Sequence, residues 1–167
     1  MEVGYCGAMT DLTAKLASTS KVETTHLVMP TDANSLGTAF GGRVMQWIDL
    51  AASMAAMRHT RMPVVTASID QLSFIAPLRL REIAVLRAQV NAVFGSSMEV
   101  EVSVVAEDPT TGEKRQCCEA FVTMVALGPN GRPTKAPLLL PQTEDEELRV
   151  RQAEARRDER LARRRKP

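Results

Sequence analysis

The chain has 167 residues, of which 44% are hydrophobic and 25% charged, and this balance predicts one packed domain with additional terminal segments. A formal net charge of +1 argues against a strong overall field for nucleic acid or an anionic membrane. The sequence shows neither an apolar run of about eighteen residues nor a charged leader followed by an apolar stretch. We therefore expect a cytoplasmic protein that binds neither nucleic acid nor membranes.

The first part of the chain predicts an arm, a strand and a loop. Residues 1–19 mix Gly, Ser and Thr with little periodicity, which indicates an N-terminal arm or a short preliminary helix. Alternating β-branched residues predict a strand over residues 21–28, and Pro30 ends it. The turn-rich segment that follows is the first place where we expect chemistry.

A long helix is predicted over residues 40–58, which contain no Pro and are rich in Ala, Met and Leu. Because this helix is apolar on nearly every side, we expect it to be buried all round. Arg58, His59 and Arg61 suit the negative end of its dipole. Small residues allow a sheet to approach it closely: Ala51, Ala52, Ala55 and Ala56.

Four β-rich segments follow without another helix, over residues 64–74, 83–94, 97–106 and 115–127. Turn residues separate them at Ala76-Pro77, at Gly95-Ser96 and from Asp108 to Gly112. Short connections favour antiparallel neighbours, so we predict a four-stranded meander. With the first strand it forms one sheet wrapped around one helix, an α+β fold.

The C-terminal part is expected to lie outside this core. Residues 129–143 are rich in Pro and predict an extended connector. Residues 144–167 open with acidic and close with basic residues, an order that suits a helix dipole. Two interpretations remain for this tail: a solvated, partly frayed helix, or an interaction tail for a partner protein or a polyanion.

The three cysteines predict no disulfide framework and no metal site. Cys6, Cys117 and Cys118 are odd in number, and neighbours in a strand point to opposite faces. Their spacing matches no set of metal ligands. We expect small packing residues rather than reactive thiols.

Asp49 is the most informative residue of the predicted helix. An ionised carboxylate in apolar surroundings costs several kcal/mol unless it is hydrogen-bonded or functional, and its sequence neighbours offer no charge partner. A desolvated Asp is a competent general base. The alternative is that Asp49 caps a loop or pairs with a distant Arg. Ser53, one turn later, could bond this carboxylate or a water, or bond back to the helix backbone.

Gly41 and Gly42 stand at the start of the helix, where free N–H groups and the positive dipole end favour an oxyanion. A simple turn is the alternative, and the spacing fits neither a dinucleotide nor a P-loop motif. A rise of about 1.5 Å per residue separates Gly41 from Asp49 by about 12 Å. Both cannot touch one carbonyl, so we predict a site shared by two helices that lie antiparallel across a two-fold axis.

Several segments together closely resemble the acyl-CoA thioesterase family of hotdog-fold proteins. They are M-P-T-D-A-N-S-L-G-T-A-F-G-G-R-V-M-Q-W-I-D at 29–49, M-R-H at 57–59, V-V-T-A-S-I-D-Q-L-S-F at 64–74 and G-S-S-M-E-V-E-V at 95–102. The resemblance runs from Thr25 to Leu127. It implies a hotdog domain over residues 20–128 with about five strands. It also implies a homodimer as the minimal active unit, dimers gathered into trimers, acyl-CoA as substrate and no cofactor.

The resemblance also implies roles for single residues. Asp49 is expected to act as general base or nucleophile, and Asn34 to place the water or the thioester. The N–H of Gly41 is expected to stabilise the oxyanion from the opposite subunit. Phosphates of coenzyme A favour Arg and backbone donors, although these groups often need no ligand. The candidates for substrate binding are Gly42, Arg58, Ser96 and Ser97.

Two departures and two alternatives accompany this resemblance. Ser73 stands where the family often has an acidic residue, and the arginine-rich tail is additional. A hotdog hydratase or dehydratase would use a His paired with an acid, but His26 and His59 do not stand at the helix start. A non-catalytic acyl-CoA sensor would keep the pocket and signal through the tail. A buried base beside Asn34 and the glycine pair favours hydrolysis.

Overall fold

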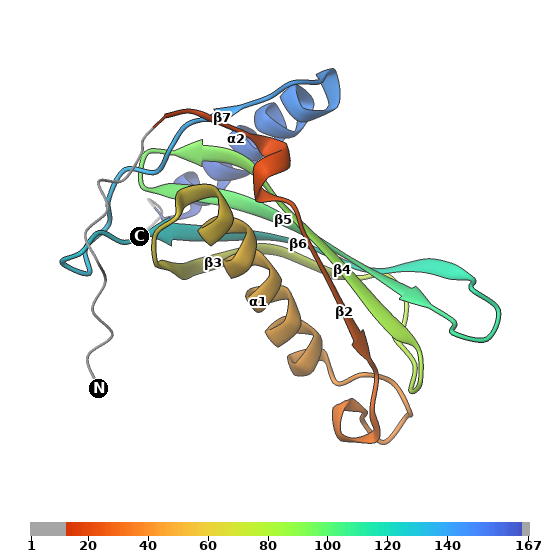
Figure 1. The fold of residues 1–167 in the computed structure, drawn as a ribbon. Coiled ribbons are helices and arrows are strands. Elements are labelled where there is room, and N and C mark those ends of the chain that lie inside the picture. Colours follow the sequence, from red (N-terminus) through yellow and green to blue (C-terminus); the bar gives the residue numbers. More distant parts are fainter. Residues whose placement is uncertain (1–12, 165–167) are drawn as a thin grey trace.

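The computed structural model describes residues 13–164 and shows one curved sheet with a helix on each face (Figure 1). Cys6, most of the arm predicted over residues 1–19 and the last residues of the tail lie outside this range. Two single-turn 3-10 helices occur at Ala17–Ser20 and Pro30–Asp32. The other elements are β1 Lys15–Leu16, β2 Val22–Leu27, α1 Gly41–Thr60, β3 Val64–Phe74, β4 Ile83–Phe94, β5 Ser97–Glu107, β6 Lys114–Ala126, β7 Leu139–Leu140 and α2 Glu144–Arg164.

The main sheet has five antiparallel strands in the order β2-β4-β5-β6-β3, as expected for the predicted α+β fold. The predicted four-stranded meander is wrong, because only β4, β5 and β6 follow one another. β3 pairs with β6 at the far edge, and residues 75–82 cross between β3 and β4. A tight two-residue turn at Gly95-Ser96, with Gly95 at φ +74°, joins β4 to β5, whereas the 75–82 connection is too long for such a hairpin.

The hydrophobic core lies between α1 and the concave face of the sheet. Ile48, Ala51, Ala52, Ala55 and Ala56 are fully buried, so the predicted close approach of sheet and helix is confirmed. The expectation of burial all round is wrong for the single chain, because the sheet covers only one side of α1. The open side carries Met45, Leu50, Met54 and Met57, which are 36–51% exposed.

The C-terminal helix α2 packs on the opposite face of the sheet, behind it in Figure 1. The predicted helix is confirmed, but its interpretation as a solvated tail is wrong. Arg149 pairs with Glu101 at 2.6 Å, and Arg156 pairs with Glu99 at 2.7 Å. Ala153 lies between these arginines on the same helix face and is fully buried. Contacts with the sheet therefore use charged side chains where an ordinary core helix would use apolar ones.

Further contacts explain why α2 stays on the sheet. The Arg156 guanidinium lies 3.7 Å from the centroid of the Phe121 ring, a cation–π contact. The connector before α2 is tied down by parallel pairing of β7 with β1. Over residues 13–164, neither helix is both long enough and apolar enough to cross a membrane.

Candidate active site

Asn34 is held in a tight loop just before α1. Its N–H donates to the carbonyl of Thr38 at 2.8 Å, and its side-chain amide lies 3.0 Å from the Thr38 hydroxyl. The side-chain oxygen accepts from the N–H of Leu36 at 2.9 Å, an Asx-type turn. Gly37, at φ +73°, completes the loop. The Asn34 side chain therefore has a defined position at the N-terminal end of α1.

The start of α1 presents two free backbone donors. The N–H groups of Arg43 and Val44 both donate to the Phe40 carbonyl, at 2.8 and 3.2 Å. In residues 13–164 the N–H groups of Gly41 and Gly42 find no acceptor. A Cβ added at Gly42 would lie 2.7 Å from the Phe40 ring, so a side chain there would displace that ring. The two donors lie at the positive end of the helix dipole, as an oxyanion requires.

Asp49 lies about two turns further along α1 and is half-buried. Its Oδ1 accepts a 2.5 Å hydrogen bond from the hydroxyl of Thr66 on β3. Among the described residues no basic side chain pairs with Asp49, and Oδ2 has no donor. The alternative of an arginine partner is therefore unsupported for this part of the chain. The open carboxylate oxygen is free to accept a proton or to bond a water.

Thr66 is the site residue that sequence reasoning missed. It lies 17 residues after Asp49, and its hydroxyl is also 3.5 Å from the sulfur of Met124. The only signal was its position inside the V-V-T-A-S segment, which carries the family resemblance. Ser53 is half-buried one turn after Asp49, but within the described chain it forms no hydrogen bond with that carboxylate.

The single chain divides the predicted site into two groups. Asn34 and Gly41 lie together at the start of α1, joined through the Asn34–Thr38 loop. Asp49, Ser53 and Thr66 lie near the middle of the helix. Eight residues of helical rise keep Gly41 and Asp49 about 12 Å apart in one copy.

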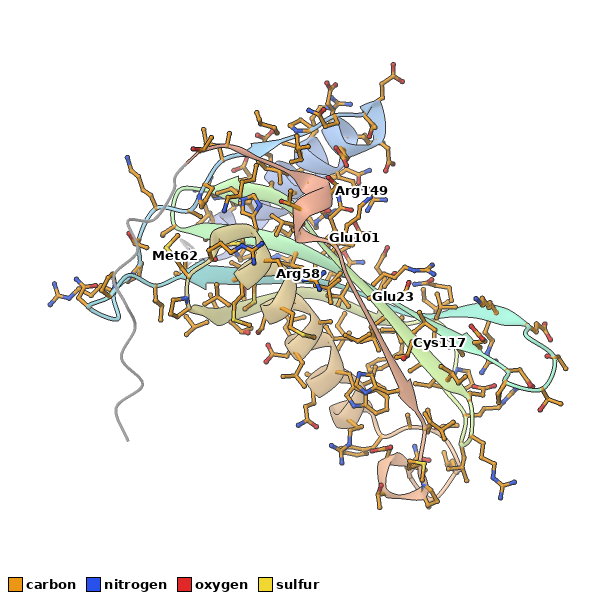
Figure 2. All side chains as sticks on the ribbon, viewed as in Figure 1. Glu23, Arg58, Met62, Glu101, Cys117 and Arg149 are labelled. Carbon is orange, nitrogen blue, oxygen red and sulfur yellow. The ribbon has the colours of Figure 1, made fainter. Side chains whose placement is uncertain are left out.

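Of the residues expected to bind coenzyme A, Gly42 lies at the start of α1, and the other three lie toward its other end. Helical rise places Arg58 about 25 Å from Gly41. In the structure its guanidinium donates to the Lys21 carbonyl. Figure 2 labels the Arg58 side chain on α1. Ser96 lies in the β4–β5 turn and Ser97 is the first residue of β5, where its hydroxyl lies 3.4 Å from the Phe94 carbonyl. Arg58 and Ser97 thus have partners within the protein, and a role in substrate binding stays a prediction.

A cavity of about 340 Å³ opens beside the start of α1. Its walls come mostly from apolar side chains of α1, β3, β5, β6 and the 75–82 connection, which suits an alkyl chain. Cys117 and Cys118 lie on its β6 wall, and both thiols are free and buried. Burial raises the pKa of Cys118 to about 11 and raises that of Cys117, so both stay protonated near neutral pH.

Neither histidine stands next to a catalytic acid. His26 stacks on Trp47 with ring centroids 4.7 Å apart, and burial lowers its pKa despite the nearby Asp32. His59 is fully buried, and its Nε2 lies 2.9 Å from the Pro137 carbonyl. Burial also lowers the pKa of His59. The described chain therefore lacks the His–acid pair that a hotdog hydratase or dehydratase would use.

The chain matches a thioesterase family model and several acyl-CoA thioester hydrolases. Residues 36–113 match the model of the thioesterase superfamily. An acyl-CoA thioester hydrolase of Bacillus subtilis, itself uncharacterised, is 42% identical over 146 residues, which cover 87% of this chain and 85% of that protein. The human cytosolic acyl coenzyme A thioester hydrolase is 36% identical over 78% of this chain. The chain spans only 35% of that longer protein.

Solved structures agree with this assignment. An apo-hexameric acyl-CoA thioesterase superimposes with a TM-score of 0.89 at 37% identity, over 93% of this chain and 99% of the other. An acyl-CoA hydrolase from Staphylococcus aureus, in complex with butyryl coenzyme A, coenzyme A and coenzyme A disulfide, gives 0.85 at 34% identity, over 90% and 92%. Structures of that enzyme also include alanine variants of one asparagine, one aspartate and one threonine. The chain is thus a thioesterase, and it belongs to the acyl-CoA thioester hydrolase family of hotdog-fold proteins.

Proposed function

We propose that this chain hydrolyses acyl-CoA thioesters to coenzyme A and a carboxylic acid, with Asp49 as general base or nucleophile. The observation that carries the proposal is the carboxylate of Asp49 on the central helix. The Thr66 hydroxyl holds one of its oxygens, and no described residue bonds the other. A carboxylate placed in this way can take a proton from water or attack a carbonyl.

The Staphylococcus aureus variants support the choice of residues. The three positions changed to alanine in that enzyme have the same spacing along its chain as Asn34, Asp49 and Thr66 have here. A common spacing in proteins that superimpose over most of their length supports equivalent positions. Of the three, Thr66 is known in this chain only through its hydrogen bond to Asp49.

The proposed mechanism assigns one task to each group. Asp49 removes a proton from water as it attacks the thioester carbonyl, or attacks the carbonyl itself. Thr66 donates to Asp49 and keeps the carboxylate oriented, while Asn34 places the water or the thioester. The N–H of Gly41 binds the oxyanion, and losing one such donor costs roughly 2.7 to 4 kcal/mol in a comparable site. Collapse of the tetrahedral intermediate expels coenzyme A as thiolate. If water attacked, the free acid is left; if Asp49 attacked, an acyl anhydride on Asp49 is left, and water then hydrolyses it to the free acid.

We further propose that the working unit is a homodimer and that dimers gather into a trimer. The open side of α1 is apolar around Asp49, with Leu50 and Met54 both exposed. The outer edge of β3 pairs with no described strand. Two copies arranged antiparallel would cover both surfaces and bring Gly41 of one copy toward Asp49 of the other. Two solved neighbours are named as hexameric.

The substrate has an acyl chain and a coenzyme A part, which would bind at different places on the protein. The cavity beside Gly41 would take the acyl chain, since its walls are mostly apolar. Gly42, Arg58, Ser96 and Ser97 would contact coenzyme A. The reaction needs no cofactor, because a thioester carbonyl is already reactive. We expect it to take place in the cytoplasm.

Replacing Asp49 tests the proposal. Asp49→Ala should lower kcat for release of free thiol from acyl-CoA by roughly 10²- to 10⁴-fold, the usual share of a general base. The oligomer should stay folded, because this half-buried side chain bonds only Thr66 within the described chain. Asp158→Ala is the matched control, since Asp158 is exposed on α2. Turnover like that of the wild type in Asp49→Ala would remove Asp49 from the mechanism.

A further inference from the structure

Strand β3 carries two β-bulges directly after Thr66. Thr66 pairs with Met124 and Ser68 pairs with the adjacent Thr123, so Ala67 is an extra residue in the ladder. A second register shift between Ile69 and Gln71 leaves Asp70 as another extra residue. A bulge re-aims the side chains around it. Here Thr66 faces α1 and Asp49, whereas Ser68 faces α2.

The carboxylate of Asp70 holds both bulges together. Its Oδ1 accepts from the Ser68 hydroxyl at 2.9 Å, and its Oδ2 accepts from the Thr123 hydroxyl at 2.8 Å. Arg160 of α2 donates to the same Oδ2 and also lies 2.5 Å from the Thr123 hydroxyl. The Asp70 and Arg160 side chains are only 10% and 16% exposed. The cluster therefore links two positions on β3, one on β6 and one on α2.

This cluster lies one ladder pair away from Thr66, whose hydroxyl bonds the proposed base. Thr123 is the partner of Ser68, and the next residue, Met124, is the partner of Thr66. A slip of β3 by one residue against β6 would turn Thr66 to the opposite face and away from Asp49. Two bulges so close together weaken the ladder at this point, because each leaves one residue unpaired. Side-chain hydrogen bonds to the Asp70 carboxylate take the place of the backbone pairing that the ladder lacks there.

We infer that Asp70 and Arg160 are positioning residues: they lock the bulged register of β3 and so keep the Thr66 hydroxyl on Asp49. The inference rests on the proposed function of Asp49. It makes the C-terminal helix part of the catalytic framework, although that helix lies on the face of the sheet away from the active site. Neither residue touches the substrate.

Replacing Arg160 is the first test, made on the full chain in its native oligomer. Arg160→Gln should lower kcat for acyl-CoA about 10-fold while KM changes less than about 2-fold, since small displacements of a catalytic group cost rate rather than binding. Arg163→Gln is the matched control. Arg163 lies on the same helix and is 79% exposed, and among the described residues its one ion pair is with Glu159 at 3.8 Å. Equal kcat values for the two variants would overturn the inference.

A double-variant cycle distinguishes positioning from general destabilisation. If Arg160 acts through Thr66, Arg160→Gln should cause no further loss of kcat once Thr66→Ala is present. The same fold-loss in both backgrounds would overturn the inference. Should Arg160→Gln reduce the folded fraction, Thr123→Val and Thr123→Ser replace it, because both leave the ion pair intact. The serine variant keeps the hydroxyl and should retain kcat, whereas the valine variant should lose it.

The Asp49→Ala variant distinguishes a failure of this inference from a failure of the proposed function. If Asp49→Ala turns over like the wild type, the proposed function fails. If Asp49→Ala is inactive while Arg160→Gln and Thr123→Val keep full kcat, only the positioning role fails.

Discussion

At the scale of single residues, His59 shows how a buried group makes stability depend on pH. It is fully buried at the end of α1, its Nε2 donates to the Pro137 carbonyl, and its Nδ1 has no hydrogen-bond partner within residues 13–164. Burial lowers its pKa in the folded protein below the unfolded value of about 6.5. As pH falls through that value, the unfolded chain takes up the proton first. The contribution of His59 to stability is therefore fully present above about pH 6.5 and is lost as the pH falls below it.

Replacing His59 with Gln tests this pH dependence. The Gln amide can still donate to the Pro137 carbonyl but does not titrate. Between about pH 7.5 and about pH 5.5 the Tm of the wild type should fall more than the Tm of His59→Gln. Thermal unfolding followed by circular dichroism measures both. An equal fall in the two proteins would show that another group carries the acid sensitivity.

At the scale of elements, α2 is a charged helix that nevertheless packs closely. The face toward the sheet carries Arg149, Arg156 and Arg160, with Ala153 between them. Acidic residues on the outer face of the sheet compensate the arginines, and Glu99 is only 1% exposed. Removing one partner of such a buried pair costs more than the pair contributes, because the other charge stays behind. The small residue at 153 sets how closely the helix approaches.

Overpacking at that position tests how closely α2 docks. Ala153→Leu should lower the free energy of unfolding by about 1–3 kcal/mol, since the fully buried site has no room for three more carbons. Ala155→Leu is the matched control, because Ala155 is exposed on the same helix. Urea unfolding compares the two variants. Equal stabilities would mean that the helix adjusts without cost.

At the scale of the whole molecule, the proposed active site needs two copies of the chain. Asn34 and Gly41 lie at one end of α1 and Asp49 near its middle, about 12 Å of helical rise from Gly41. The exposed apolar side of α1 and the free edge of β3 are the surfaces available for a second copy. Two variants that are inactive because they lack different site residues should therefore regain activity when they form a mixed dimer.

Mixed oligomers of Asn34→Ala and Asp49→Ala subunits test this sharing. Each mixed dimer would contain one site with both residues intact, so a random mixture should recover about one quarter of wild-type kcat. Co-expression of the two variants at equal levels gives such a random mixture, and thiol release from acyl-CoA measures its turnover. Either variant alone is the control. Turnover in the mixture no higher than in the controls would contradict a site built from two subunits.

Most element boundaries were determined by the sequence itself, because periodicity and turn residues act over a few positions. Residues 64–74 and 83–94 were predicted with the boundaries that β3 and β4 have. The acid of Asp49 in an apolar helix, and the glycines at its start, were likewise visible from local chemistry.

Tertiary structure decided what depends on residues far apart in the chain. The pairing of β3 with β6, the hydrogen bond of Thr66 to Asp49 across 17 positions and that of Arg160 to Asp70 across 90 had no local signal. Strand order and long-range ion pairs follow from which surfaces meet when the chain closes. For this reason the sequence predicted a charged helix at the C-terminus, and only the fold placed it against β3, the strand whose Thr66 hydroxyl bonds the proposed base.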